Sequence, residues 1–595
     1  MLQAKKDALL QAARQQVEKV REQLLVATST KETKTEHLSS SVKTLRGSDA
    51  IIERTLLAHH QEQLGNLKQL YPSPYFAFCD FEHNGERKSL YFGKFSFRDA
   101  NIYSWITPVA ALRFEPVGPA AYTRPGGTVQ SGITHRKDTY LIADGQIRFF
   151  ATEELGQTRE LVYQEHFTRH KAGFILPDVV EQMERAQDNV VRLSYAGPLV
   201  ISGPAGSGKT TLALHRVAYL LQSPETAEFF PPESVLVLVQ DAGTKAYFSS
   251  LLPSLGITNV AIQTFGEWAL ATLQLSDCIV QHHAYGDEAT TIAYEFSKAS
   301  ALRTTPPISE SAKPFLVLEK IYRPFFSAAQ QQIWQTQVAS RTLDRFDLTL
   351  LLNIRRNAGE LTQEKEYYET LKNGQYRKKT GRFSVRYNLL VVDEFQNYLP
   401  EQLAIFKSVL NRRTNAVVYV GDLAQQTRLG TIRDWSAINE TILPERLIKL
   451  QKVYRNTKQI LTYIRTRGYE VTIPEGIKEG EPVVEHHVES VEEQLDLLTQ
   501  LVPADPNQTL GIICPVANYL QPFKARFADD SRVRCLTFYE AQGVEFDTVA
   551  IVGWNETFFS TEHIVEGARE EVGRMHKDLL YVALTRAMEK LVILK

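Results

Sequence analysis

The stretch GPLVISGPAGSGKTTLALHRVAYLLQ, residues 197–222, constrains the fold more than any other part of the chain. A short apolar run leads into a glycine-rich loop, and a segment rich in leucine, alanine and valine follows it. The loop from Gly203 to Thr210 matches G-x-x-x-x-G-K-[ST], the pattern of a phosphate-binding loop between a strand and a helix. The pattern predicts an α/β domain that binds a nucleoside triphosphate.

The residue types of this loop suit a polyphosphate. Glycines let the backbone turn tightly and direct its N–H groups at phosphate oxygens, and the helix that begins near Lys209 adds its positive dipole end. Lys209 can reach the β and γ phosphates, and the Thr210 hydroxyl can ligate Mg²⁺. We expect the following residues to hold the nucleotide and its metal: Gly203, Gly206, Ser207, Gly208, Lys209, Thr210 and Thr211.

Length and composition set the remaining limits. A chain of 595 residues predicts several domains, and it contains no apolar run of about 18 residues that could span a membrane. The polar N-terminus lacks a secretory signal, and the four scattered cysteines indicate neither a zinc site nor a disulfide framework. We therefore expect a cytoplasmic protein. Because the net charge is only −2, any binding to nucleic acid must come from local basic patches.

The chain divides into five predicted segments. Residues 1–70 carry a helical apolar stripe (Leu10, Ala13, Val17, Val20 and Leu24) that a polar run at 27–40 interrupts, so we expect two helices with a break there. They form either a hairpin that packs on itself or an arm that docks into a partner. The other segments are a β-rich module at 71–165, a first motor domain at 166–275 and 385–445, a helical insertion at 276–384 and a second motor domain at 446–595.

Six apolar runs predict the strands of two parallel sheets: PLVISG, SVLVLVQ, YNLLVVDE, AVVYVGD, TLGIICP and DTVAIVGW. The insertion between them is charged and contains a basic patch, formed by Arg377, Lys378, Lys379, Arg382 and Arg386.

Further motifs follow the phosphate loop in a fixed order. Asp393 and Glu394 end an apolar strand, where the first carboxylate can hold Mg²⁺ and the second can polarise the attacking water. The next strand is followed by GDLAQ, which contains Gln425. Arg455 and Arg586, in YRN and LTRA, are suited to stabilising charge on a transferring phosphate.

This order of motifs, with GVEFD, resembles that of UvrD-type superfamily 1 helicases over residues 187–595. The resemblance implies an ATPase with two RecA-like domains and ATP between them. It implies an adenine contact from Gln187, stacking by Tyr454, phosphate and Mg²⁺ binding by Lys209, Thr210 and Asp393, and a catalytic base at Glu394. It also implies that Gln425, Arg455 and Arg586 sense the γ-phosphate, while Gly543 and Glu545 contact that phosphate or the ribose.

A second resemblance covers regions outside the motor motifs. The stretches PYFAFCDFEHNGERKSLYFGKFSF and YSWITPVAALRFEPVGPAAYTRPGG resemble the HelD family of ATPases associated with RNA polymerase. That resemblance implies a motor that binds RNA polymerase, inserts an arm and frees the polymerase from nucleic acid. The hairpin and the insertion are both shorter here than is usual in that family.

Strand separation is not favoured by the sequence. The motif T-x-H-x-x-K-G reads Thr537-Phe-Tyr539-Glu-Ala-Gln542-Gly543, and the segment after Gln425 lacks stacking aromatic residues. The stretch between Asn456 and Thr537 is too short for a large accessory domain. Three hypotheses remain: a HelD-like factor acting on RNA polymerase, a translocase or helicase on single-stranded DNA, and an ATP-dependent switch within a protein complex.

Overall fold

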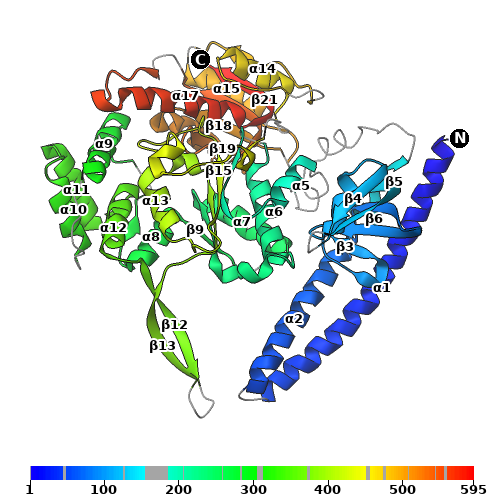
Figure 1. Cartoon of the computed structure of the whole chain (residues 1–595). Helices are drawn as coiled ribbons and strands as arrows, with labels where there is room; N and C mark the ends of the chain where they lie inside the picture. The colour runs from blue at the N-terminus through cyan, green and yellow to red at the C-terminus, as the bar shows by residue number, and fades with distance from the viewer. Residues whose placement is uncertain are drawn as a thin grey trace.

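The computed structural model of the chain describes residues 2–44, 48–124, 128–154, 185–204, 207–257, 259–281, 284–304, 313–370, 376–450, 456–473, 477–488, 490–506, 508–542, 544–554 and 559–595. Two domains are built on parallel sheets, as the sequence predicts. The chain also contains an N-terminal helical hairpin, a β-rich module and an insertion within the first domain (Figure 1). Within the described ranges, no helix has both the length and the apolar character needed to cross a membrane.

The N-terminal hairpin consists of α1 (Leu2–Thr44) and α2 (Ser48–Leu70). The predicted break at 27–40 is wrong, because α1 continues through the polar run. No proline or glycine occurs before Gly47, so nothing in this stretch forces the backbone out of the helix. Side-chain hydroxyls instead donate to the carbonyl four residues earlier, as in a regular helix. These residues are Thr30, Thr33, Thr35 and Ser40.

The predicted apolar stripe of α1 is buried, but its main partner is the β-rich module. Val17, Val20 and Leu24 are at most 1% exposed in a core that also contains Tyr75 and Phe78. From Ala27, at the edge of this core, α1 continues for about 25 Å to its end, at 1.5 Å per residue. Figure 1 shows this distal part of the hairpin projecting away from the module.

The β-rich module is a six-stranded sheet in which β2 and β3 pair in parallel and the other neighbours are antiparallel. Its strands are β1 (Ala77–His83), β2 (Glu86–Gly93), β3 (Ile102–Ser104), β4 (Gly118–Thr123), β5 (Val129–Ala143) and β6 (Gln146–Glu154). The ring of Trp105 meets His215 of the first motor domain edge-on, with centroids 5.4 Å apart. Arg192 donates to the Trp105 and Ile106 carbonyls, which anchors the module.

The first motor domain has a six-stranded parallel sheet with the order β16-β7-β15-β14-β8-β9. Its central strands are buried apolar runs because helices cover both faces. The strands are β7 (Gly197–Ser202), β8 (Val235–Val239), β9 (Ala261–Thr264), β14 (Leu389–Asp393), β15 (Ala416–Gly421) and β16 (Leu447–Lys449). The helices are α5 (Arg185–Arg192), α6 (Lys209–Gln222), α7 (Ala242–Ser254), α8 (Phe265–Leu273) and α13 (Pro400–Ser408).

The insertion is helical only in its first part. Its helices are α9 (Glu288–Thr304), α10 (Pro314–Tyr322), α11 (Ala328–Ser340) and α12 (Arg345–Ala358), with short strands β10 (Ile279–Val280) and β11 (Thr342–Leu343). A two-stranded antiparallel hairpin follows, formed by β12 (Thr362–Thr370) and β13 (Tyr376–Ser384), so the prediction of helix there is wrong. Asn373-Gly374, a typical hairpin-turn pair, is the signal that the sequence analysis missed.

The predicted basic patch is partly neutralised by this pairing. Lys378 forms an ion pair with Glu366 at 2.7 Å, and Lys379 forms one with Glu369 at 2.8 Å. The acidic residues lie on β12 and the basic ones on β13, so the two groups meet only when the strands pair.

The second motor domain has a five-stranded parallel sheet with the order β17-β21-β20-β18-β19. Its strands are β17 (Val484–His486), β18 (Leu510–Cys514), β19 (Val533–Thr537), β20 (Phe546–Val552) and β21 (Ala587–Leu594). Its helices are α14 (Lys458–Thr466), α15 (Val491–Leu501), α16 (Gln521–Arg526) and α17 (Arg569–Thr585).

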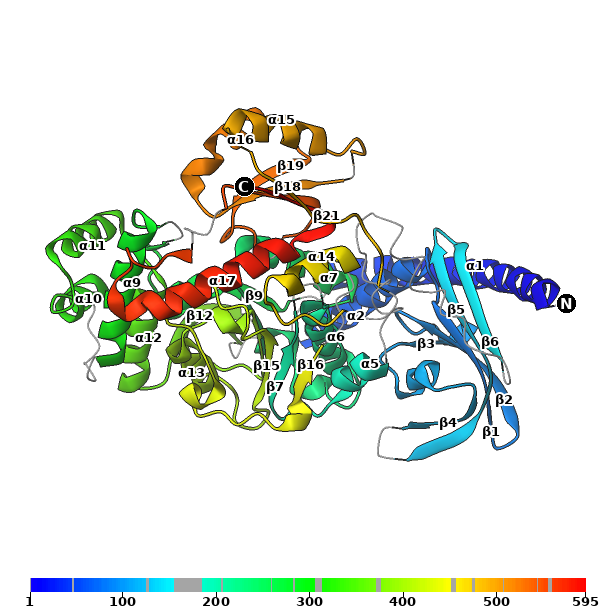
Figure 2. The same ribbon diagram turned by 90° about the horizontal axis from the view of Figure 1, so that it is seen from above.

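Helix α17 connects the second domain to the insertion. Val572 and Met575 on α17 are buried against Ile292 on α9, and the His576 ring lies 2.8 Å from a Glu288 carboxylate oxygen. Figure 2 shows α17 running from the side of α9 toward β21. This contact holds the second domain against the insertion of the first.

Candidate active site

The phosphate loop leaves the carboxyl end of β7 and enters α6 at Lys209. Gly208 precedes the helix in the left-handed region, with φ 83°, which favours glycine. A Cβ at Gly203 would lie 2.5 Å from the Leu450 carbonyl oxygen, so only glycine fits the space there. Gly206 lies outside the described residues.

Lys209 and Thr210 lie at the start of α6 and face the end of strand β14. The Lys209 ammonium donates to the Pro204 carbonyl at 3.0 Å, and the Thr210 hydroxyl donates to Asp393 Oδ1 at 3.2 Å. The Ser207 hydroxyl is buried and makes no hydrogen bond within the described residues. The loop thus places the Thr210 hydroxyl and the charge of Lys209 beside a single carboxylate, an arrangement that fits a phosphate group with a divalent metal.

Asp393 and Glu394 follow β14 directly. Asp393 is 2% exposed, and burial, followed by the charge of Glu394, raises the pKa of Asp393 to about 8, while Lys209 and Thr210 act in the opposite direction. Among the described residues, no group of three or more His, Cys, Asp or Glu side chains is arranged to hold a metal. A metal here would rely on Asp393, Thr210 and the phosphates, which is how Mg²⁺ commonly binds.

Glu394 adopts a left-handed backbone, with φ 50° and ψ 46°, an unusual conformation for a residue with a side chain. The Gln396 amide donates to Glu394 Oε2 at 2.5 Å, and its oxygen accepts from the Asp422 backbone N–H at 3.0 Å. Gln396 is 1% exposed. It therefore links the end of β14 to the end of β15, a role that the sequence analysis did not assign although Gln396 lies within the motif VVDEFQ.

Gln425 belongs to the same group of side chains. Its amide donates to Asp422 Oδ2 at 2.7 Å, and its own side chain is 5% exposed. Because β15 lies between β7 and β14, Asp422 stands beside the phosphate loop and the Asp393 carboxylate. The structure therefore brings together Lys209, Thr210, Asp393, Glu394 and Gln425 at one edge of the first sheet.

The second domain carries Arg586 and the segment around Glu545. The Arg586 guanidinium is buried and donates to the Val582 and Val544 carbonyls, so it lies beside that segment. Asn456 donates to the carbonyls on either side of Arg586, which joins two of the sequence motifs. Glu545 is half-buried, as is Gln187 on α5. Besides Gly206, three predicted site residues lie outside the described residues: Tyr454, Arg455 and Gly543.

The loop after Gln425 faces the second domain. The Gln426 backbone N–H donates to Asp578 at 2.9 Å, and the Gly430 N–H donates to Glu571 at 2.7 Å. Burial raises the pKa of Asp578 to about 7. The Gln542 amide donates to the Thr427 hydroxyl. These contacts connect the phosphate-loop edge of the first sheet to α17 and to the altered T-x-H-x-x-K-G motif of the second domain.

Gln396→Ala is expected to lower the rate of nucleotide hydrolysis roughly 10- to 100-fold, the effect typical of removing the outer-shell partners of a metal site. Nucleotide affinity should change little, because Gln396 orients Glu394 without contacting the loop. Phosphate release and fluorescent-nucleotide binding measure the two quantities. Gln331→Ala on α11 is the matched control, and equal losses in rate and affinity would contradict a positioning role.

Comparisons with known proteins agree with this architecture. Residues 249–595 match the family model of the UvrD-like helicase C-terminal domain. Residues 3–165 match the model of the N-terminal domain of DNA helicase IV HelD. No curated protein matches the chain.

One solved structure with local similarity is the C-terminal domain of a possible DNA helicase from Lactobacillus plantarum WCFS1. It is 20% identical over 24% of this chain and 87% of that one, with a TM-score of 0.17, too low to support a structural or functional conclusion.

Proposed function

Because this chain belongs to the UvrD-like helicase family, a family of nucleotide-hydrolysing motors, we propose that it hydrolyses ATP in order to bind RNA polymerase and free it from nucleic acid. The observation that carries the polymerase assignment is the match of residues 3–165 to the HelD N-terminal domain, outside both motor domains.

We assign roles at the ATP site from the motifs and from the geometry around them. Lys209 would bind the β and γ phosphates, and Thr210 with Asp393 would hold Mg²⁺, which would neutralise phosphate charge when bound. Glu394 would polarise the attacking water, and Gln396 would keep the carboxylate in place. The remaining assignments are those implied by the motifs: Gln187 and Tyr454 at the adenine, Gln425, Arg455 and Arg586 at the γ-phosphate, and Gly543 and Glu545 at that phosphate or the ribose.

The N-terminal hairpin has the surface expected of a docking arm. Its distal part projects from the module (Figure 1), and three aliphatic side chains of the hairpin are exposed to solvent. Leu25 is 51% exposed, Val26 68% and Leu56 45%. Exposed aliphatic residues on a projecting hairpin are suited to contacting another protein, since association removes their apolar surface from water.

Shortening the hairpin is expected to weaken capture of RNA polymerase, because it removes Leu56 and the projecting tip while Leu25 and Val26 remain, and to leave ATP hydrolysis unchanged. Replacing residues 31–62 with a short glycine–serine linker retains the buried residues Val17, Val20 and Leu24, whereas removing all of residues 1–70 would uncover the core of the module. Polymerase retained on the immobilised protein is the measurement, with phosphate release as the check on the motor.

A point-substituted protein keeps this test independent of folding. Leu25→Ser, Val26→Ser and Leu56→Ser together should weaken capture, and Val129→Ser with Ile133→Ser, which are exposed on β5, should not. Undiminished capture by both hairpin variants would rule out the arm.

A translocase on single-stranded DNA is the second candidate, because the UvrD-like match covers most of the motor. Stimulation of ATP hydrolysis by single-stranded DNA, together with robust unwinding of a tailed duplex, would favour this candidate. Against it, Tyr539 and Gln542 are engaged by other parts of the chain in this structure: the Tyr539 hydroxyl lies 3.5 Å from Glu288 of the insertion, and the Gln542 amide donates to the Thr427 hydroxyl of the first domain. A switch subunit would show neither polymerase capture nor stimulation by DNA.

A further inference from the structure

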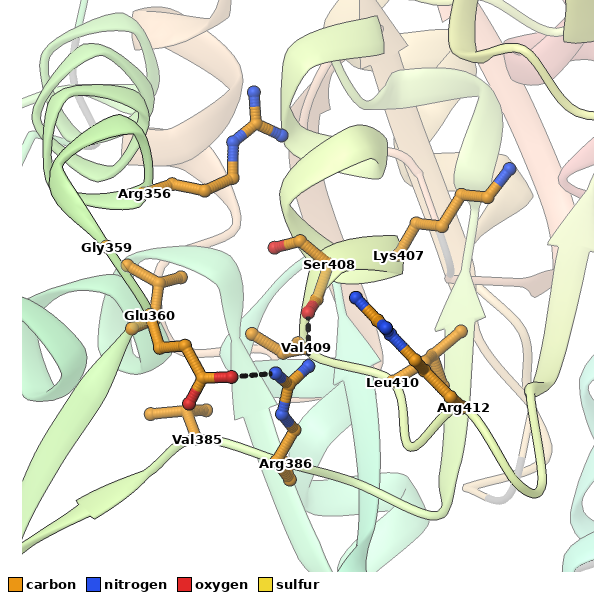
Figure 3. Close-up of a pocket in the computed structure, with 11 residues that line it drawn as sticks. Arg356, Gly359, Glu360, Val385, Arg386, Lys407, Ser408, Val409, Leu410 and Arg412 are labelled. Atoms are coloured by element: carbon orange, nitrogen blue, oxygen red, sulfur yellow. Dashed lines mark hydrogen bonds and ion pairs between the residues drawn. The ribbon is translucent and has the colours of Figure 1, made fainter.

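A pocket of about 540 Å³ lies at the base of the β12–β13 hairpin (Figure 3). Its lining comes from the end of α12, the two points where the chain enters and leaves the hairpin, the end of α13 and the segment before β15. These segments precede β14 and β15, so the pocket lies at the amino ends of the strands. The ATP-site residues lie at the opposite edge of the same sheet, about 17 Å away along strands of five residues.

The pocket is strongly basic. Its lining contains Arg356, Arg386, Lys407 and Arg412, and the acidic side chain among the lining residues is Glu360. That carboxylate is already engaged, because it pairs with Arg386 and accepts from the Ser384 hydroxyl at 2.6 Å. The local charge is therefore not balanced within the pocket.

The four cations differ in their polar partners. Lys407 pairs with Glu440 at 2.9 Å, and Arg386 donates to the Ser408 carbonyl at the end of α13. Within the described ranges, the side chains of Arg356 and Arg412 form no hydrogen bond or ion pair, although the charge of Arg412 helps to lower the pKa of Glu360. Capping of the end of α13 thus explains why a cation stands at Arg386, but it does not explain the cations at Arg356 and Arg412.

The arrangement leaves guanidinium groups open to an anion. Burial lowers the pKa of Arg356, and Figure 3 shows the Arg386 and Arg412 guanidinium groups directed toward one another beside Ser408. Arg386 and Arg412 are exposed, so an anion from solvent can reach both groups and would offset the repulsion between them. Guanidinium groups bind phosphate especially well because their N–H donors match its oxygens.

The hairpin extends from the pocket, and at its base Leu361 and Val385 lie on one face while Glu360 and Arg386 lie on the other. The Val385 backbone N–H donates to the Leu361 carbonyl, so these two pocket residues continue the register in which β12 and β13 pair. Alternation along the strands then places Tyr367, Lys379 and Phe383 on the same face. Tyr367 and Phe383 are 39% and 43% exposed. Their rings meet edge-on, with centroids 5.6 Å apart.

We propose that this pocket and the adjoining hairpin face bind the backbone phosphates of a single nucleic-acid strand, at a site separate from the ATP cleft. Basic side chains interspersed with exposed aromatic rings suit a strand, whose phosphates and bases they meet together. A free phosphorylated small molecule would occupy the pocket alone and leave the two exposed rings unused. The proposal goes beyond the polymerase assignment and does not depend on it.

The test is fluorescence anisotropy of labelled oligo(dT) with the full-length, nucleotide-free protein over a range of salt concentrations. Arg356→Glu with Arg412→Glu should weaken binding at least about tenfold and reduce the slope of log K against log salt by about 0.7 for each phosphate that the variant no longer neutralises. Tyr367→Ser with Phe383→Ser should weaken binding about tenfold, because bases can no longer stack on the two rings. The control is Lys320→Glu with Arg323→Glu, at the end of α10, where both side chains are exposed. It makes the same change in charge elsewhere on the surface and should leave the affinity and the salt slope unchanged.

Basal ATP hydrolysis should be normal in every variant, which separates this site from the motor. Three results would overturn the proposal. The Arg356 and Arg412 variant could bind oligo(dT) with unchanged affinity and salt slope. Pyrophosphate binding could be abolished in that variant while strand binding persists, which would identify a site for a free phosphate ligand. Polymerase capture could be abolished while strand binding persists, which would identify a surface for a protein partner.

Discussion

Lys209→Ala is expected to abolish ATP turnover, with a loss of at least about 10²–10³-fold, the effect of removing one preorganised charge-stabilising donor. The Lys209 ammonium is the cation that lies over the phosphate loop, where it donates to the Pro204 carbonyl. Its charge also lowers the pKa of Asp393, so its loss should weaken metal binding as well. Phosphate release under saturating ATP and Mg²⁺ measures the rate.

The matched control is Lys245→Ala in the same domain. Lys245 forms an exposed ion pair with Glu267 at 2.7 Å, and such pairs contribute little to stability. Turnover in the control should therefore stay near that of the unaltered protein. If Lys209→Ala kept a tenth or more of the normal rate, the phosphate loop would not be the hydrolytic site.

Glu394→Gln is expected to keep ATP binding and to slow hydrolysis about 10²–10⁴-fold, the usual contribution of a general base. Glutamine has the same shape and still offers an oxygen to the Gln396 amide, so the local structure should persist. Removing the Glu394 charge also removes one cause of the raised pKa of Asp393, which favours the metal-binding carboxylate. Single-turnover hydrolysis and equilibrium binding of a fluorescent nucleotide separate the two effects.

Glu401→Gln on α13 makes the same chemical change in the same domain and should leave both quantities unchanged. Normal hydrolysis by Glu394→Gln would show that another group activates the water. A large loss of nucleotide affinity would instead show that Glu394 helps to hold the ligand.

Local patterns predicted the nucleotide-binding domain because each of its motifs is a continuous stretch of the chain. A strand, a glycine-rich loop and a helix lie within 26 residues, and apolar runs such as LLVVD identify strands buried on both faces. The error at residues 27–40 has the opposite cause. Polar composition indicates exposure, whereas only proline, glycine or a competing hydrogen bond ends a helix.

The sequence by itself determined the parallel sheets, the order of the motor motifs and the residues available to bind a nucleotide, since each depends on neighbouring positions. Tertiary structure alone decided that Gln396 links Glu394 to Asp422, and that acidic β12 partly neutralises basic β13. It also decided that Arg356, Arg386 and Arg412 line one pocket. Their positions differ by up to 56 residues in the chain, and only the packing of α12, α13 and the hairpin base brings their charges together.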